Sequence, residues 1–124
     1  MIEYMFEKVL GNLSVSVIES DLPHGWWGSY DHATGTIRLN RALAPLQKRS
    51  TLTHELAHAA LGHTGYSPRQ ERAAEELAAT WLIRHCDFQH ASRIYDNITA
   101  IAHELWVLPR DVQAYLRYLQ RTQK

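Results

Sequence analysis

At 124 residues, with 45% hydrophobic and 21% charged residues, the chain has the length and composition of one globular domain. Thirteen Lys and Arg residues balance thirteen Asp and Glu residues, so no overall field draws the protein to nucleic acid or to an anionic membrane. Glu3 and Glu7 interrupt the apolar N-terminal stretch, which argues against a secretory signal. The single Cys86 cannot form an internal disulfide. A cytoplasmic location without membrane association is therefore expected.

The first half of the chain is predicted to be extended. Residues 13–18 alternate Leu or Val with Ser, and residues 36–40 alternate again, which indicates half-buried strands. Asp31 and Gly35 are turn signals between them. Trp26 and Trp27 could line a substrate groove, but a loop anchored on the sheet is the favoured interpretation. This pattern predicts a small, mostly antiparallel sheet.

The second half of the chain is predicted to be helical. Helices are expected over residues 45–61, from 68 to about 85, over 87–105 with a possible break near 96–97, and from 109 onward. Ser67, Pro68 and Gln70 form a helix start, with Ser as the N-cap. The apolar face expected for the last helix comprises Val112, Tyr115, Leu116 and Leu119. Strands followed by helices indicate an α+β fold, in one domain over residues 1–124.

The run from His54 to His58 has the spacing of a metal site. On a helix, His54 and His58 lie about 40° apart on one face and about 6 Å apart along the axis, so both imidazoles can ligate one zinc ion. Glu55 is rotated by about 100° from His54, beside the metal, where a general base acting on a zinc-bound water belongs. The alternative is an amphipathic helix that carries two surface His residues and an ordinary Glu.

A catalytic zinc ion needs a third protein ligand, and Glu71 is the candidate. Glu71 extends the core-facing stripe of the second helix, formed by Ala74, Leu77, Ala78, Trp81 and Leu82. A carboxylate that faces the core is costly unless a cation receives it. Arg72 and Glu76 fall outside the stripe. Glu75 lies at its edge, where it could accept the free ring N–H of a ligating His. If the two helices form an antiparallel hairpin, Glu71 becomes level with His58.

Together these segments resemble the ImmA/IrrE family of bacterial and phage metallopeptidases, over most of the chain. The resemblance rests on residues 49–58, 61–63, 70–79, 82 and 83, with weaker support from 28–31, 36–40 and 101–107. It implies a small antiparallel sheet packed on a zincin-like helical core with a C-terminal helical hairpin over residues 98–122. One departure is Glu75, because the family often has Asp or Asn four residues after the ligand carboxylate.

The resemblance implies a gluzincin-type site with one Zn²⁺ per chain, in which His54, His58 and Glu71 are ligands and Glu55 is the base. It also implies a protein substrate, typically a helix-turn-helix repressor of a phage or mobile element. The developing oxyanion needs a further donor, for which Tyr30, His63 and Tyr66 are candidates that the sequence does not separate. A strand over residues 36–40 at the sheet edge could hold an extended substrate.

Two other functions compete with peptide hydrolysis. A zinc-binding regulator or sensor could retain this fold without catalysis. A DNA-binding regulator could use residues 101–105 and 109–119 as a helix-turn-helix, with a basic tail from Arg110 to Lys124. The zero net charge and the apolar Trp106, Val107 and Leu108 favour a hairpin that closes the core, so direct nucleic-acid binding is not expected.

Overall fold

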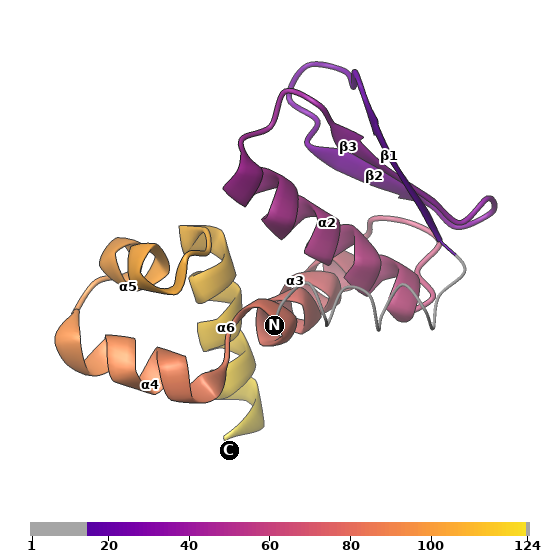
Figure 1. The fold of residues 1–124 in the computed structure, drawn as a ribbon. Coiled ribbons are helices and arrows are strands. Elements are labelled where there is room, and N and C mark those ends of the chain that lie inside the picture. Colours follow the sequence, from indigo (N-terminus) through magenta and orange to yellow (C-terminus); the bar gives the residue numbers. More distant parts are fainter. Residues whose placement is uncertain (1–14, 124) are drawn as a thin grey trace.

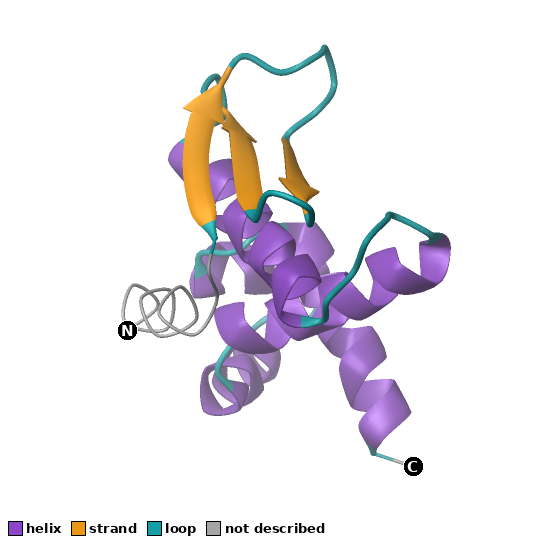
Figure 2. Ribbon diagram, turned by 90° about the vertical axis from the view of Figure 1, so that its right-hand side faces the viewer, coloured by secondary structure: helices purple, strands orange, loops and turns teal. Residues whose placement is uncertain are grey.

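The computed structural model describes residues 15–123, and within them the chain forms an α+β fold of three strands and five helices (Figure 1). The strands are β1 (Ser16–Ser20), β2 (Gly28–Asp31) and β3 (Thr36–Asn40). The helices are α2 (Pro45–Ala60), α3 (Pro68–Leu82), α4 (His85–Ile94), α5 (Ile98–Leu105) and α6 (Pro109–Thr122). The sheet covers one side of α2, and the other helices lie beyond its opposite side (Figures 1 and 2). The α+β prediction is confirmed.

The sheet is mixed, with the strand order β1-β3-β2. β2 and β3 pair antiparallel, with Asp31 opposite Thr36, whereas β1 and β3 pair parallel, with Ser16 opposite Thr36. The expectation of an antiparallel sheet is therefore wrong for β1. Residues 21–27 carry the chain from β1 past the central strand to the opposite edge. Alternation of apolar and polar residues specifies which face of a strand is buried, but not the direction of its neighbour.

The turn between β2 and β3 follows the signals in the sequence. Asp31 Oδ1 accepts a hydrogen bond from the backbone N–H of Ala33 at 3.0 Å, and the N–H of Gly35 donates to the Asp31 carbonyl at 2.8 Å. Gly35 has φ = 66°, a left-handed conformation that glycine adopts without a steric penalty. This turn sets the register of the antiparallel pair.

β3 is the central strand and carries the buried face of the sheet. Ile37 and Leu39 are buried and pack against Leu56 of α2. Since β3 is not an edge, the expectation that residues 36–40 bind substrate along a sheet edge is wrong, and β1 and β2 form the edges. The first predicted strand was placed over 13–18, of which 13 and 14 lie outside the described residues. The observed β1 is mostly exposed rather than half-buried, with Val17 at 38% and Ile18 at 43% exposure.

The helix boundaries follow the predicted caps closely. The Ser67 Oγ accepts a hydrogen bond from the Gln70 N–H while the Gln70 side chain accepts from the Ser67 N–H, so the predicted capping box is confirmed. α3 ends at Leu82, three residues before the expected end. The predicted break near 96–97 separates α4 from α5, and the Asn97 side chain caps α5. No helix in the described part of the chain has the length and apolar character needed to cross a membrane.

The second half of the molecule has its own core, built where α6 packs against α3 and α5. Val112 and Tyr115 are buried there, and Leu116 and Leu119 are half-buried against them, as the apolar face predicted. Glu76 lies outside the predicted core-facing stripe of α3 and is nevertheless buried, with 6% exposure, which corrects the assumption of a single buried face. Its carboxylate accepts hydrogen bonds from Arg121 of α6 at 2.8 and 3.0 Å. α3 is thus covered on two sides, by α2 and by α6.

Candidate metal centre

α2 presents three site residues within little more than one helical turn. Glu55 and His58 are buried, with 4% and 1% exposure, and His54 is half-buried. The four-residue spacing brings the imidazole rings together, with Nε2 of His54 and Nε2 of His58 3.1 Å apart. The rings meet edge to face at 83°, so both Nε2 atoms point to the same space. This is the face that the motif predicted.

α3 brings Glu71 to the two imidazoles. The capping box at Ser67 starts α3 directly before Glu71, whose N–H donates to the Ser67 carbonyl at 2.8 Å. α2 and α3 pack as a hairpin, and Glu71 becomes level with His58 as expected. Glu71 Oε1 lies 2.7 Å from His58 Nε2, and Glu71 Oε2 lies 3.4 Å from His54 Nε2.

The three donor groups have the chemistry and spacing of a metal site. One ligand atom from each of His54, His58 and Glu71 lies within 4.8 Å of the others. A tetrahedral zinc ion with bonds of 2.0–2.1 Å separates its ligands by roughly 3.3 Å, and the observed separations of 2.7, 3.1 and 3.4 Å are close to that value. Burial lowers the pKa of His54 and of His58, which favours the neutral imidazoles that bind metals. These residues fit a zinc ion.

Two further residues, His63 and Glu75, are candidates for contacts with the ligating imidazoles. The Nδ1 of His63 is 2.9 Å from the Nδ1 of His58, so His63 contacts the side of that ring opposite the metal-facing nitrogen. Glu75 was expected to accept a ring N–H from a ligating His. Its Oε2 instead accepts a hydrogen bond from Arg117 Nη2 at 2.9 Å, while the second ring nitrogen of His58 meets His63.

Glu55 is buried beside the donors and accepts a hydrogen bond from the Tyr66 hydroxyl. Burial raises the pKa of Glu55 to about 7, and the hydrogen bond from Tyr66 opposes that shift. The Tyr66 hydroxyl lies 3.2 Å from Glu55 Oε2, and its ring packs edge-on against His58 at 4.9 Å between centroids. A carboxyl group with this pKa exchanges a proton near neutral pH.

The three oxyanion candidates occupy different places. Tyr66 is next to Glu55, whereas His63 lies behind His58. The hydroxyl of Tyr30 lies 3.4 Å from Nδ1 of His32, and its ring packs against the sheet core. The backbone of Tyr30, however, is hydrogen-bonded to the Tyr66 hydroxyl. Of the three, only Tyr66 brings its side-chain donor to the base.

Arg110 borders the site, although the sequence indicates it only as part of a basic C-terminal tail. Two hollows adjoin His54, one of about 310 Å³ on the side of Trp27 and one of about 260 Å³ on the side of Glu75, and Arg110 lines both. The guanidinium stacks over the Trp27 ring at 4.6 Å from its centroid. Trp27 thus lines a groove as well as anchoring a loop. No local pattern could reveal Arg110, because it lies 55 residues or more from the motif residues it borders, and only folding of α6 brings it there.

Residues 12–112 match the model of the Peptidase_M78 family, described as the IrrE N-terminal-like domain. The match covers most of the chain and contains the three metal-site donors and Glu55. No curated protein and no solved structure matches this chain.

Proposed function

The chain belongs to the IrrE N-terminal-like family of peptidases, and we propose that it is a zinc-dependent endopeptidase in which Glu55 is the general base. The observation that carries the proposal is the convergence of His54, His58 and Glu71 within 4.8 Å, directly beside a buried carboxyl group. A His₂Glu donor set that leaves a fourth position open is typical of catalytic rather than structural zinc.

Each residue has a distinct role in the proposed hydrolysis. When bound by these donors, zinc supplies Lewis-acid chemistry and makes water acidic near neutral pH. Glu55 takes a proton from the attacking water and returns it to the leaving amine. In the metal-free protein, burial raises the pKa of this carboxyl group to about 7. The Tyr66 hydroxyl, 3.2 Å from Glu55, is the proposed donor to the oxyanion. His63 would receive the ring N–H of His58 and so hold its Nε2 toward the metal.

Glu75 has a less direct role in this proposal. Its carboxylate is engaged by Arg117, yet it lines the same hollow as His54 and Glu71. Its charge favours the protonated form of His54 and opposes the effect of burial on the pKa of that ring. We therefore assign Glu75 to the electrostatics of the hollow rather than to a hydrogen bond with a ligating imidazole.

The proposed substrate is a protein, and on the family resemblance a helix-turn-helix repressor of a phage or mobile element. Such a substrate would place the enzyme in the cytoplasm. We interpret residues 98–122 as a helical hairpin that closes the single domain rather than as a DNA-binding module. The buried Val112 and Tyr115, and the packing of α6 on α3 and α5, support this interpretation, because a recognition helix needs a free face.

The test compares the wild type with Glu55→Gln on candidate repressors, with the zinc content of both proteins measured by mass spectrometry. Both proteins are expected to bind about one zinc ion, and only the wild type is expected to cleave. Cleavage by the variant at an unchanged rate would remove Glu55 from the role of base. Zinc binding without cleavage of any repressor by the wild type would favour a sensor that retains the fold.

A further inference from the structure

We propose that Arg110 binds a carboxylate of the substrate in the hollow beside Glu55, and so selects where the chain is cut. This inference rests on the proposed peptidase function. It assigns a role to a residue of the C-terminal helix that neither binds the metal nor transfers a proton. The 310 Å³ hollow is lined by Trp27, Gly28, Thr51 and Glu55 as well as by Arg110 and His54, so an occupant would lie directly next to the metal centre.

The guanidinium of Arg110 is held in place by neutral groups. Its Nη2 donates to Ser50 Oγ at 3.0 Å and to Thr51 Oγ1 at 3.4 Å, and its Nε reaches Ser50 Oγ at 3.3 Å. Trp27 packs against one face of the guanidinium. Ser50 and Thr51 are only 2% and 3% exposed, so the anchors belong to the rigid α2 helix. These contacts fix the orientation of a side chain that is otherwise long and flexible.

Arg110 forms no ion pair with a described residue, although the carboxyl groups of Asp111 and Glu55 feel its charge at longer range. Among residues 15–123, no carboxylate oxygen lies within 4.0 Å of its nitrogens, whereas Arg117 and Arg121 of the same helix pair with Glu75 and Glu76. The neighbouring carboxylate, Asp111, instead accepts hydrogen bonds from Ser50 Oγ at 2.9 Å and from the Leu108 N–H at 3.0 Å. A cation that is positioned by neutral partners and keeps donors free is suited to an anionic ligand.

A carboxylate is the ligand that this arrangement fits best. The Nη1 group makes no hydrogen bond with the described residues and lies on a guanidinium that borders both hollows. Glu55 lines the same hollow and would repel an anion close to it, so the carboxylate is expected at the Trp27 side, next to Arg110. The carboxylate could belong to an acidic side chain or to the C-terminus of the substrate, and the two sources share this chemistry.

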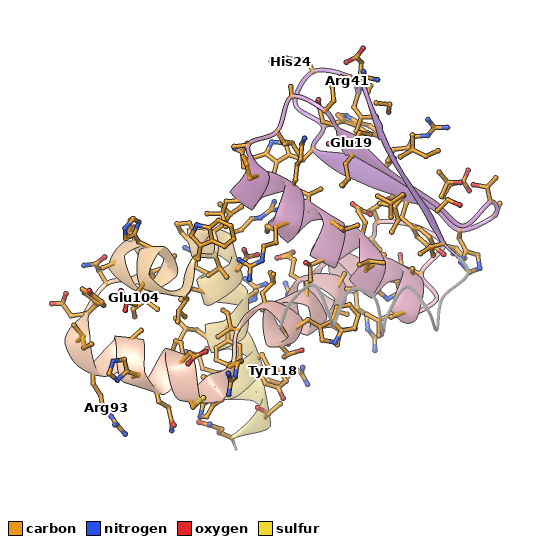
Figure 3. The ribbon with its side chains drawn as sticks, in the orientation of Figure 1. Glu19, His24, Arg41, Arg93, Glu104 and Tyr118 are labelled. Carbon is orange, nitrogen blue, oxygen red and sulfur yellow. The ribbon has the colours of Figure 1, made fainter. Side chains whose placement is uncertain are left out.

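The test uses hydroxamate-capped peptides, in which the hydroxamate binds zinc and the peptide occupies the flanking hollows. Each peptide carries one hydroxamate, at its N- or its C-terminus. Glu is compared with Gln at each of the three positions nearest to the hydroxamate, one position at a time. Peptides with an N-terminal hydroxamate are made with a free or an amidated C-terminus. Calorimetry on the zinc-loaded protein measures Kd for the wild type, Arg110→Gln, Arg110→Lys and the control Arg93→Gln. Arg93 extends from α4 on the side of the molecule remote from the sheet and α2 (Figure 3).

The wild type and Arg93→Gln are expected to prefer one carboxylate form over its amide by about 10- to 100-fold, the range for a hydrogen-bonded charge. Arg110→Gln is expected to lose this preference while it binds the amide forms as the wild type does. Preference for Glu over Gln identifies a side chain as the source, and preference for the free over the amidated terminus identifies the C-terminus. Arg110→Lys keeps the positive charge but lacks the planar guanidinium that can bind a carboxylate with two hydrogen bonds. This variant is therefore expected to retain only part of the preference for the carboxylate form.

Three results would overturn the inference. The first is equal binding of acids and amides by the wild type. The second is an equal loss of affinity for acids and amides in Arg110→Gln with a wild-type melting temperature, which would give Arg110 a general role in positioning. The third is no hydroxamate binding at all, which would also remove the zinc site. Because the readout is binding, absence of cleavage would contradict the proposed function and leave a measured carboxylate preference intact.

Discussion

The hydroxyl group of Tyr66 is hydrogen-bonded to both the backbone N–H and the backbone carbonyl of Tyr30. Its oxygen lies 2.6 Å from the Tyr30 N–H, which donates to it, and 3.2 Å from the Tyr30 carbonyl. The carbonyls of Trp27 and Asp31 accept hydrogen bonds from Asn40 and Gly35, on the side of β3. The groups of Tyr30 therefore face the edge of β2 that pairs with no other described strand, and the same Tyr66 hydroxyl lies 3.2 Å from Glu55 Oε2. A substrate that adds to this edge must displace Tyr66.

Tyr66→Phe is expected to lower kcat by about 100-fold, as loss of one oxyanion donor does. It is also expected to lower KM, because the phenyl ring no longer occupies the Tyr30 backbone and the edge of β2 is free for a substrate strand. Steady-state kinetics on an extended peptide or repressor measure both constants. Tyr118→Phe, near the end of α6, is the control and should leave both constants unchanged (Figure 3). A fall in kcat with an unchanged KM would mean that Tyr66 does not compete with the substrate for the edge of β2.

Glu71→Gln is expected to weaken zinc binding by more than about 100-fold, because it replaces an anionic ligand by a neutral amide, whereas Glu75→Gln should weaken it by less than about tenfold. The two residues are one helical turn apart and undergo the same substitution, so each is a control for the other. Competition with a chelator of known affinity gives both dissociation constants. The opposite ranking would make Glu75 the third ligand.

Gly28→Ala is expected to destabilise the protein by about 1–3 kcal/mol, as overpacking does. A Cβ atom at Gly28 would lie 2.6 Å from Thr51 Cγ2 and 3.0 Å from the Arg38 carbonyl oxygen, because β2 packs directly on α2 at this point. Thr51→Ser removes Cγ2 and keeps the hydroxyl, so the double variant should recover part of the loss. Urea unfolding gives the free energies. Gly65→Ala, where the nearest atom is 3.5 Å away, is the control; equal effects at the two glycines would contradict the close approach.

Asp111 makes the stability of the protein depend on pH. Burial raises the pKa of Asp111 above its ordinary value of 3.8, against the opposing effect of the Leu108 and Ser50 hydrogen bonds. Between the two pKa values the folded state binds more protons than the unfolded state, so the stability contributed by protonated Asp111 is lost as pH rises. The free energy of unfolding of the wild type relative to Asp111→Asn should therefore fall from pH 3.8 upward. Urea unfolding of both zinc-free proteins at a series of pH values measures this difference, and a difference that rises with pH would contradict the direction.

Local signals were sufficient where a feature depends on nearby residues. The spacing of His54 and His58 determines that both rings share one helix face, and the box formed by Ser67 and Gln70 determines where α3 starts and hence where Glu71 lies. The break before α5 was likewise signalled by Asn97, whose side chain caps that helix. These features could be predicted because hydrogen bonds within a few residues produce them.

Features that depend on distant packing could not be predicted in this way. The parallel pairing of β1 with β3 depends on the path of residues 21–27, and no alternation pattern encodes it. A helical wheel of α3 considers one buried face and leaves Glu76 outside it, whereas α6 covers a second face and supplies Arg121 as the partner of Glu76. The nearness of Arg110 to Glu55 has the same origin, since α6 must dock before the two can share a hollow.

The hydroxyl of Ser50 joins the last helix to the metal-bearing helix. The Ser50 hydroxyl donates a hydrogen bond to the Asp111 carboxylate and accepts one from the Arg110 guanidinium. Two adjacent residues of opposite charge on α6 thus bind the same oxygen atom of α2. The first turn of α6 therefore both holds that helix on α2 and lines the two hollows beside His54. The carboxylate selection proposed for Arg110 therefore depends on how the first turn of α6 packs against α2. On the proposed role of Arg110, substrate specificity can change through substitutions in α6 while the metal-binding motif stays the same.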